Sequence, residues 1–297
     1  MKALKKMLEL SRQFRVEKGK GFRLKDVDTA DTGGLKSAFK DDAQALLQQS
    51  VQQLASLQDK LYAQDRWSML LIFQAMDAAG KDSTIKHVMS GVNPQGVQVY
   101  SFKQPSAEEL DHDYLWRCVR CLPERGRIGI FNRSYYEEVL VVKVHSEILK
   151  GEKLPEELIT KKIWRERYED INAFELHLAR NGTKICKFFL HVSKEEQKQR
   201  FLARLEQPEK NWKYSAADVK ERQCWEDYQD AYEEAIRATS TKHAPWYVLP
   251  ADHKWFTRLM VGAAVTDTLL DLNPEYPKVS PAERELLQKA KIELESQ

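Results

Sequence analysis

A glycine and a lysine follow a short apolar run near residue 70, and this order is typical of loops that bind phosphate. The run Met69 to Phe73 is followed by the segment AMDAAGKD, residues 75–82. In such a loop, backbone N–H groups and the start of the next helix converge on an anion, and the lysine reaches the distal phosphates. The residues that we expect to bind phosphate are Ala78, Ala79, Gly80, Lys81, Asp82 and Ser83.

The loop departs in two places from the general pattern G-x-x-x-x-G-K-[ST]. Ala75 stands where the first glycine is expected, and Asp82 stands where a hydroxyl that binds Mg²⁺ is expected. A carboxylate repels a nearby phosphate unless a cation lies between them. Asp77 lies inside the loop, where an acid is useful if it holds Mg²⁺ or positions an acceptor. An ordinary ATPase or GTPase is therefore disfavoured.

A second polar segment, NRSYYE at residues 132–137, follows another apolar run at residues 128–131. Ligands bind outside the carboxyl ends of parallel strands, so we expect this segment to face the phosphate loop. Asn132 stands where the second nucleotide-binding motif usually has an aspartate associated with Mg²⁺. Arg133 could neutralise charge on a transferring phosphoryl group, and Glu137 could join Asp77 on the metal. The alternatives are a structural ion pair for Arg133 and a surface position for Glu137.

The elements that must position these residues alternate along the chain. Further apolar runs at residues 185–192 and 246–249 are, like the first two, each followed by polar or helical sequence. This alternation predicts a mainly parallel, doubly wound sheet. Apolar residues at helical spacing from Phe39 to Leu61 predict a long amphipathic helix before the loop. Capping boxes at Ser193 and Ser280 predict the starts of two later helices.

The composition is that of a globular enzyme. The 297 residues carry a net charge of +2 and are 42% apolar, which excludes a globally basic nucleic-acid coat protein. No apolar run reaches roughly 18 residues, and no signal sequence is apparent at the N-terminus. The four cysteines do not form a zinc-binding or disulfide pattern, and no H-E-x-x-H motif occurs among the seven histidines. We therefore expect a cytoplasmic protein with no membrane partner and no specific nucleic-acid partner.

The charge pattern suggests three regions. Residues 1–36 form a basic N-terminal arm, which we expect to be solvated, with contact to a polyanion as the alternative. We expect residues 37–275 to form one domain that contains both phosphate motifs, and residues 276–297 to form a C-terminal helix.

Several separated blocks are similar to the family-2 polyphosphate kinases, from about Gly21 to about Pro274. They include QAMDAAGKDSTIKHVMSGVNPQGV (residues 74–97), GIFNRSYYEEVLVVKVH (129–145), NWKYSAADVKER (211–222) and APWYVLPADHKWFTRL (244–259). The Asn-Arg-Ser-x-x-Glu and Gly-Lys-Asp forms resemble the subgroup that phosphorylates both nucleoside monophosphates and diphosphates. The departures noted above thus agree with this subgroup.

The resemblance implies an α/β fold of the thymidylate-kinase-like P-loop kind, with a parallel sheet flanked by helices and a helical lid at about residues 193–222. It implies transfer of phosphate between inorganic polyphosphate and AMP, ADP and other purine nucleotides such as GMP and GDP. The cofactor would be Mg²⁺, or Mn²⁺ in its place, and we expect a homo-oligomer. The implied catalytic residues are Asp77, Lys81, Arg133 and Glu137, of which Asp77 and Glu137 would hold the metal. The implied lid residues that contact polyphosphate are Arg200, Arg204 and Lys213.

Lys103, Asp113 and Arg117 lie between the two phosphate motifs, where related kinases gather residues that bind the acceptor nucleotide. Asp113 and Arg117 are four residues apart, so an ion pair within one helix is an equal alternative. Two other functions stay open at this point: an ATP-dependent nucleotide or nucleoside kinase, and a noncatalytic protein that binds polyanions.

Overall fold

A six-stranded sheet forms the centre of the computed structural model, which describes residues 2–35 and 40–297. The strand order is β1-β6-β5-β2-β4-β3. Strands β2 to β6 pair in parallel, and β1 pairs antiparallel with β6. The bounds are β1 (Arg15–Val16), β2 (Ser68–Gln74), β3 (Val97–Ser101), β4 (Ile128–Asn132), β5 (Thr183–His191) and β6 (Trp246–Pro250).

Four of these strands coincide with the predicted apolar runs, and the α/β fold is confirmed. Strands β2, β4, β5 and β6 are almost completely buried, because helices cover both faces of the sheet. We did not predict β3 or β1. Strand β3 lies at the sheet edge and is only partly buried, and β1 has two residues, so neither has the continuous apolar run of a central strand.

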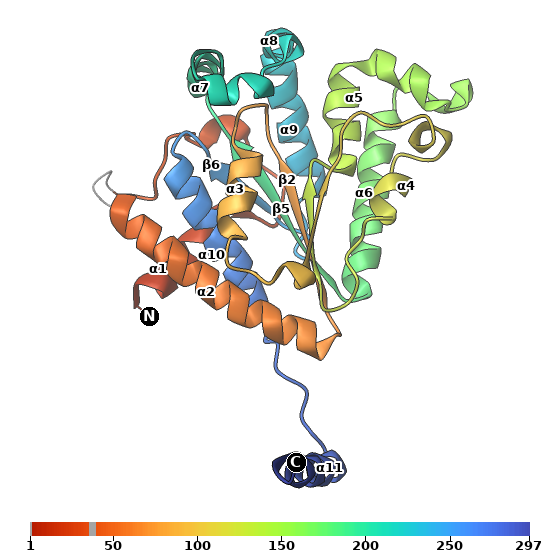
Figure 1. Cartoon of the computed structure of the whole chain (residues 1–297). Helices are drawn as coiled ribbons and strands as arrows, with labels where there is room; N and C mark the ends of the chain where they lie inside the picture. The colour runs from red at the N-terminus through yellow and green to blue at the C-terminus, as the bar shows by residue number, and fades with distance from the viewer. Residues whose placement is uncertain (1, 36–39) are drawn as a thin grey trace.

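Helices cover the two faces of the sheet unequally (Figure 1). One face carries α1 (Lys2–Arg12), α2 (Lys40–Gln64), α3 (Lys81–Val88) and α10 (Lys254–Leu272). The other face carries α6 (Ile163–Arg180) and α9 (Trp225–Thr239), with the short helices α4 (Trp116–Val119) and α5 (Val141–Val144) nearby. Within the residues that the structure describes, no helix is both long and apolar enough to span a bilayer.

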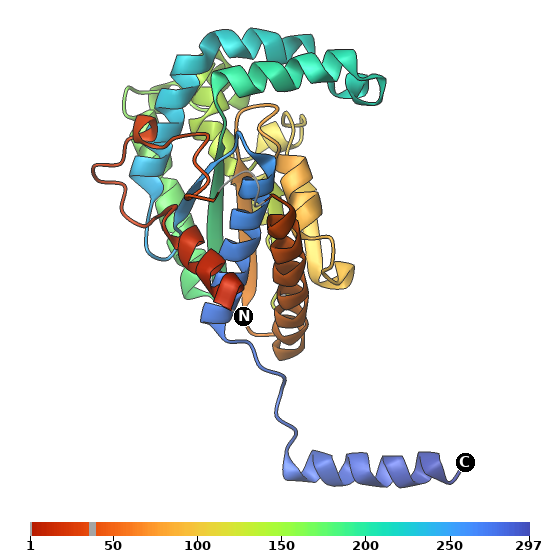
Figure 2. The ribbon, with the colours of Figure 1, turned by 90° about the vertical axis from the view of Figure 1, so that its left-hand side faces the viewer.

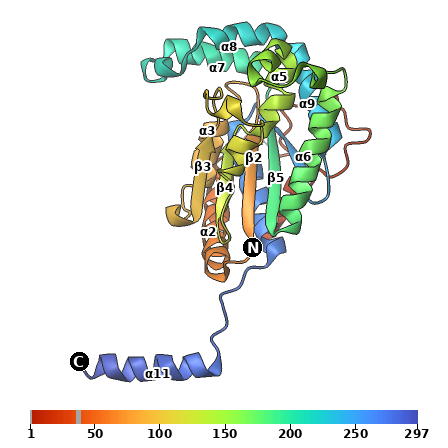
Figure 3. The same cartoon turned by 90° about the vertical axis from the view of Figure 1, so that its right-hand side faces the viewer.

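The helices of the predicted lid, α7 (Lys194–Glu206) and α8 (Ala216–Glu221), lie over the carboxyl ends of the strands (Figure 3). Ser193 caps α7 as expected, and its Oγ accepts from the Glu196 N–H at 3.0 Å. The other half of the predicted capping box does not form, because the Glu196 carboxylate pairs with Arg200 at 2.7 Å. The second box is complete: Ser280 and Glu283 cap α11 (Pro281–Glu295), which projects away from the rest of the chain (Figure 2).

The segment of residues 2–35 packs on the domain through α1 and β1, whereas we expected a solvated arm. Met7 is 1% exposed and faces the core, and Arg12 donates two hydrogen bonds of 2.7 Å to Asp267 on α10. Strand β1 then extends the sheet beside β6. The charged residues of the segment concealed an amphipathic helix with one buried face. The long second helix is confirmed from Lys40 onward, and Phe39 lies outside the described residues.

The register of the central strands brings the two phosphate motifs together. Phe73 in β2 lies opposite Asn132 in β4, so both strands end at the same edge. The Arg133 N–H then donates to the Phe73 carbonyl at 3.0 Å. The loop after β2 and the segment after β4 therefore start as neighbours, as parallel pairing requires.

A buried ion pair contacts the segment after β4 from the core of the domain. Lys187 of β5 and Glu175 of α6 are both fully buried, and their side chains are 2.6 Å apart. Glu175 also accepts hydrogen bonds from the hydroxyls of Tyr135 and Tyr136, which lie between Arg133 and Glu137 in the sequence. Burial lowers the pKa of Lys187, and the nearby carboxylate opposes this shift.

Replacing Lys187 with methionine tests this support. The change leaves a buried carboxylate without its cation, so we expect the free energy of unfolding to fall by about 3–5 kcal/mol. Urea denaturation measures the change. Lys184→Met, at a partly buried position of the same strand, is the matched control and should stay within about 0.5 kcal/mol of the unchanged protein. Equal effects of the two changes would contradict the role of the pair.

Candidate active site

The loop between β2 and α3 has the backbone of a phosphate loop. Ala78 and Gly80 have φ angles of 63° and 108°, both in the left-handed region. Gly80 adopts this conformation readily, whereas Ala78 is strained there by about 1–2 kcal/mol. The first intrahelical bond of α3 runs from the Thr84 N–H to the Gly80 carbonyl at 3.0 Å. The N–H groups of the first turn, at residues 81–83, are therefore available to an anion, as expected.

Two of the residues predicted to bind phosphate make hydrogen bonds within the loop. The Ala79 N–H donates to the Met76 carbonyl at 3.2 Å, so it closes a turn within the loop and is not directed at an anion. The Ser83 hydroxyl donates to the Gly80 carbonyl at 3.0 Å, which leaves its N–H as the group available to phosphate. The Ala79 N–H and the Ser83 hydroxyl are thus both engaged within the loop.

Lys81 is the first residue of α3, and its side chain lies in the loop. It is 9% exposed, and its Nζ donates to the Ala75 carbonyl at 2.8 Å. Burial, followed by the positive charge of Arg133, lowers the pKa of Lys81 to about 8. A phosphate beside Lys81 would stabilise the charged form of the lysine, which burial alone disfavours.

Arg133 joins the two halves of the site, because its guanidinium lies between two carboxylates. Its Nη2 is 2.6 Å from Asp77 Oδ1, and its Nη1 is 3.0 Å from Glu137 Oε2. Gln74 donates to the other Glu137 oxygen at 2.7 Å. The charge of Glu137 raises the pKa of Arg133 further above its ordinary value. The ion pair that we considered as an alternative for Arg133 is thus present, and the same contacts hold its guanidinium beside the loop.

The pair Asp82 and Asn132 accounts for the unusual loop sequence. The Asn132 amide donates to Asp82 Oδ1 at 2.7 Å. An aspartate at position 132 would place two carboxylates in direct contact and repel Asp82. The asparagine therefore fits the Gly-Lys-Asp form of the loop, since each residue needs the other.

The four predicted catalytic residues, Asp77, Lys81, Arg133 and Glu137, are brought together at the strand ends. Among the described residues, no group of three or more His, Cys, Asp or Glu side chains could hold a metal ion alone. Mg²⁺ is usually bound by one or two carboxylates together with substrate phosphates. Asp77 and Glu137 are two carboxylates of this kind, and both lie within 3.0 Å of the Arg133 guanidinium.

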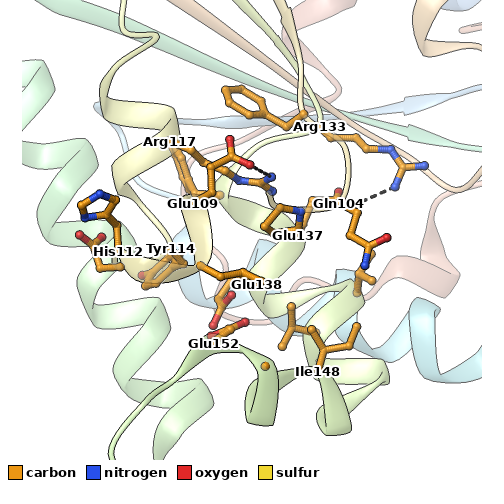
Figure 4. Close-up of a pocket in the computed structure, with 18 of the residues that line it drawn as sticks. Gln104, Glu109, His112, Tyr114, Arg117, Arg133, Glu137, Glu138, Ile148 and Glu152 are labelled. Atoms are coloured by element: carbon orange, nitrogen blue, oxygen red, sulfur yellow. Dashed lines mark hydrogen bonds and ion pairs between the residues drawn. The ribbon is translucent and has the colours of Figure 1, made fainter. Parts of the chain in front are cut away.

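A cavity of about 660 Å³ adjoins Arg133 and Glu137 (Figure 4). Lys103, Asp113 and Arg117, the predicted acceptor residues, all line it. The alternative, an ion pair between Asp113 and Arg117, does not form. Asp113 precedes α4 and accepts from the Leu115 N–H at 2.9 Å, whereas Arg117 donates to the Lys103 carbonyl at 2.7 Å and lies 3.8 Å from Glu109.

Three charged residues that we did not predict line another part of the cavity. Arg167 of α6 contacts Glu138 at 3.0 Å and Glu152 at 3.7 Å, and the two acids lie beside each other (Figure 4). Burial, followed by the charge of Glu152, raises the pKa of Glu138 to about 8. No sequence spacing connects these residues, because they come from three separate segments.

The predicted lid residues have different surroundings from those expected. Arg200 is 7% exposed, and its N–H groups donate to Glu196 and to four backbone carbonyls. Arg204 contacts Asp218 at 3.3 Å within the lid. The Arg200 guanidinium is therefore fully engaged by protein acceptors, whereas, among the described residues, Arg204 donates only through Nη1, to Asp218 and to the Lys213 carbonyl. Lys213 is exposed on the lid.

Two cations near Arg200 were also missed. Lys254 and Arg258 are one turn apart on α10, and the pKa of each is lowered, first by burial and then by the charge of Arg200. The Arg258 Nε is buried without a hydrogen-bond partner among the described residues. Lys254 and Arg258 thus add positive charge beside Arg200, and Glu196 offsets part of it.

Comparisons with known proteins agree with this geometry. A family model described as Polyphosphate kinase 2 (PPK2) matches residues 37–277. An ADP-polyphosphate phosphotransferase of Rhodopseudomonas palustris is 54% identical over 94% of this chain and 96% of its own. An AMP/ADP-polyphosphate phosphotransferase of Meiothermus ruber is 44% identical over 93% and 99%. The crystal structure of Polyphosphate Kinase 2 from Arthrobacter aurescens has a TM-score of 0.83 and 42% identity, covering 92% of this chain and 95% of that one.

The lowered pKa of Lys81 predicts how anion binding depends on pH. Below pH 8 the lysine is charged, so affinity for tripolyphosphate should be at its maximum. Above its pKa of about 8, binding must first add a proton, and affinity should fall by up to about tenfold per pH unit. Calorimetric titration between pH 6.5 and 9.5 measures this dependence.

Lys81→Arg is the matched control, because arginine stays charged throughout this range. The ratio of the two Kd values removes the titration of tripolyphosphate itself. That ratio should be constant below pH 8 and change above it. A constant ratio over the whole range would contradict the assignment.

Proposed function

The chain belongs to the polyphosphate kinase 2 family, and we propose on this basis that it transfers phosphate between inorganic polyphosphate and nucleotides. AMP and ADP are the acceptors that the names of its relatives support, with ADP and ATP as the products. One observation carries the proposal to this chain. Asp77, Lys81, Arg133 and Glu137 meet beside a cavity that is lined by the predicted acceptor residues.

The side chains of the site act by positioning and charge neutralisation. The terminal phosphate of AMP or ADP is largely ionised at pH 7, because its second pKa is about 6. A strong general base is therefore unnecessary. The first-turn N–H groups of α3 and Lys81 hold the donor phosphate, and Arg133 stabilises charge on the phosphoryl group during in-line transfer. Arg117 and Lys103 lie where they can orient the acceptor.

Mg²⁺ is the proposed cofactor, with Asp77 and Glu137 as its protein ligands, and Mn²⁺ can take its place. When bound, the ion supplies positive charge that the four side chains lack, since two acids and two bases sum to zero. Polyphosphate carries about one negative charge per phosphate, so it requires that additional charge. GMP and GDP as acceptors, a homo-oligomeric state and a cytoplasmic location remain predictions from the sequence.

Two assays separate this proposal from its alternatives. An ATP-dependent nucleotide kinase would transfer phosphate from ATP but not from polyphosphate. A noncatalytic polyanion-binding protein would bind polyphosphate in a strongly salt-dependent manner without any turnover. The proposed enzyme forms ADP and ATP when it is incubated with long-chain polyphosphate, Mg²⁺ and either AMP or ADP.

Removal of single site residues tests the roles in transfer. We expect Asp77→Asn, Lys81→Ala, Arg133→Ala and Glu137→Gln each to lower kcat by at least about tenfold, because each removes a contact to the transferring phosphate or its cation. Lys86→Ala, on the exposed side of α3, is the control and should retain full activity. Full activity in purified Lys81→Ala and Glu137→Gln would reject the assigned roles.

Removal of the metal tests the cofactor. Treatment with a chelator should abolish transfer from polyphosphate, and added Mg²⁺ or Mn²⁺ should restore it. Because Glu137→Gln keeps the shape of the side chain but loses a charged ligand, its half-saturating Mg²⁺ concentration should rise by about tenfold. Undiminished transfer in the chelated protein would show that no divalent ion is required.

A further inference from the structure

The phosphate loop is held from its outer side by the first two turns of α7. In a loop that turns its N–H groups toward an anion, carbonyl groups point away from it and need donors of their own when they are buried. Three successive carbonyls of the loop, at Asp77, Ala78 and Ala79, receive hydrogen bonds from side chains of α7. The lid and the loop are therefore in direct contact through these carbonyls.

Gln197 provides the first of these contacts. It is 1% exposed, and its Nε2 donates to the Asp77 carbonyl at 2.8 Å. The Gln197 side-chain oxygen accepts from Arg222 Nη1 at 2.6 Å. Arg222 Nη1 also donates to the Lys194 carbonyl at 3.0 Å. Since a guanidinium only donates, Arg222 fixes the amide with its NH₂ group toward the loop. Arg222, at the end of the lid, thus links Gln197 to the Lys194 carbonyl at the start of the lid.

Arg200 provides the other two contacts. Its Nη1 donates to the Ala79 carbonyl at 2.7 Å and to the Ala78 carbonyl at 3.2 Å. Its Nη2 donates to Ala251 and Asp252 at 2.6 and 3.1 Å, and its Nε donates to Glu196. A guanidinium has five N–H donors, and all five are directed at protein acceptors. Arg200 therefore joins the lid helix, the phosphate loop and the segment after β6.

We propose that Gln197 and Arg200 are positioning residues for the phosphate loop. By binding the carbonyls of residues 77–79, they hold Ala78 in its strained left-handed conformation and keep the loop N–H groups and Lys81 aligned with the donor phosphate. A change in the position of α7 moves the loop with it. The position of the lid therefore determines whether the loop keeps its phosphate-binding conformation. The donor side of the reaction depends on these contacts, whereas the acceptor cavity is formed by other segments.

Hydrogen exchange tests the structural part of this proposal without any activity. In Gln197→Met and Arg200→Met, the amides of Ala79 and Thr84, whose N–H groups are hydrogen-bonded within the loop, should exchange at least about tenfold faster than in the unchanged protein, because the loop opens more often. Gln199→Met lies on the exposed side of α7 and is the control, with unchanged exchange. Unchanged exchange in Gln197→Met would overturn the proposal.

Kinetics test the positioning role, and this part rests on the proposed function. For Gln197→Met we expect kcat to fall and the KM for polyphosphate to rise by at least about tenfold, with the KM for ADP within about twofold. An equal rise in both KM values would indicate general damage to the fold and would overturn the proposal. If the unchanged protein shows no transfer from polyphosphate but loop exchange still responds, the proposed function fails and the loop contacts stand.

Arg200→Lys separates positioning from direct contact with polyphosphate. A lysine retains the charge but cannot span four carbonyls as a planar fork does. If Arg200 positions the loop, the Lys variant should resemble Arg200→Met in loop exchange and in the KM for polyphosphate. If Lys restores both values, Arg200 acts as a charge on the donor, and the proposal is wrong for this residue. Gln197→Met still tests the loop contacts if both Arg200 variants fail to fold.

Discussion

The placement of one guanidinium between two carboxylates is the constraint on which the site depends. A protein that binds polyphosphate must admit a dense negative charge, yet Asp77 and Glu137 lie at the point of entry. Arg133, 2.6 and 3.0 Å from these acids, keeps them apart and holds them at the loop. The parallel register of β2 and β4 makes this possible, because it starts both segments at one edge of the sheet. Any distortion of that edge would separate Arg133 and Glu137 from the loop that contains Asp77.

Buried charges elsewhere in the chain support this edge. Lys187 and Glu175 hold the two tyrosines that follow Arg133, and Arg200 holds the outer side of the phosphate loop. Lys187, Glu175 and Arg200 each have partners that satisfy their charge, which is the condition under which buried charges are tolerated. Positive charge in this protein therefore has two uses. Lys187 and Arg200 are bonded to buried groups of the framework, whereas Lys81 lies in the phosphate loop and Lys254 lies close to Arg200.

The sequence revealed the parts of the fold that depend on local pattern. Central strands appeared as apolar runs, and the phosphate loop appeared because a strand, a glycine and a lysine occur in order. Strand β3 did not appear, because an edge strand is covered on fewer sides. The N-terminal segment was misjudged, since its many charges concealed the face that packs against α10. In each case the missing information was which neighbour a residue meets.

The same limit applied to the site. Asp77, Lys81, Arg133 and Glu137 could be predicted because both motifs follow strands that pair. Arg200 was assigned to the donor because the resemblance implies a place in the lid and its charge suits polyphosphate, but the buried carbonyls around it cannot be seen in the sequence. The cluster of Glu138, Glu152 and Arg167 comes from three segments and could not be found.

A crystal structure of the protein with Mg²⁺ and tripolyphosphate, without an acceptor, tests the central claim most directly. We expect one phosphate within hydrogen-bond distance of Lys81 Nζ and the Arg133 guanidinium, with the metal ion against the carboxylates of Asp77 and Glu137. A phosphate chain bound elsewhere, with these four side chains in their present contacts, would contradict the assignment.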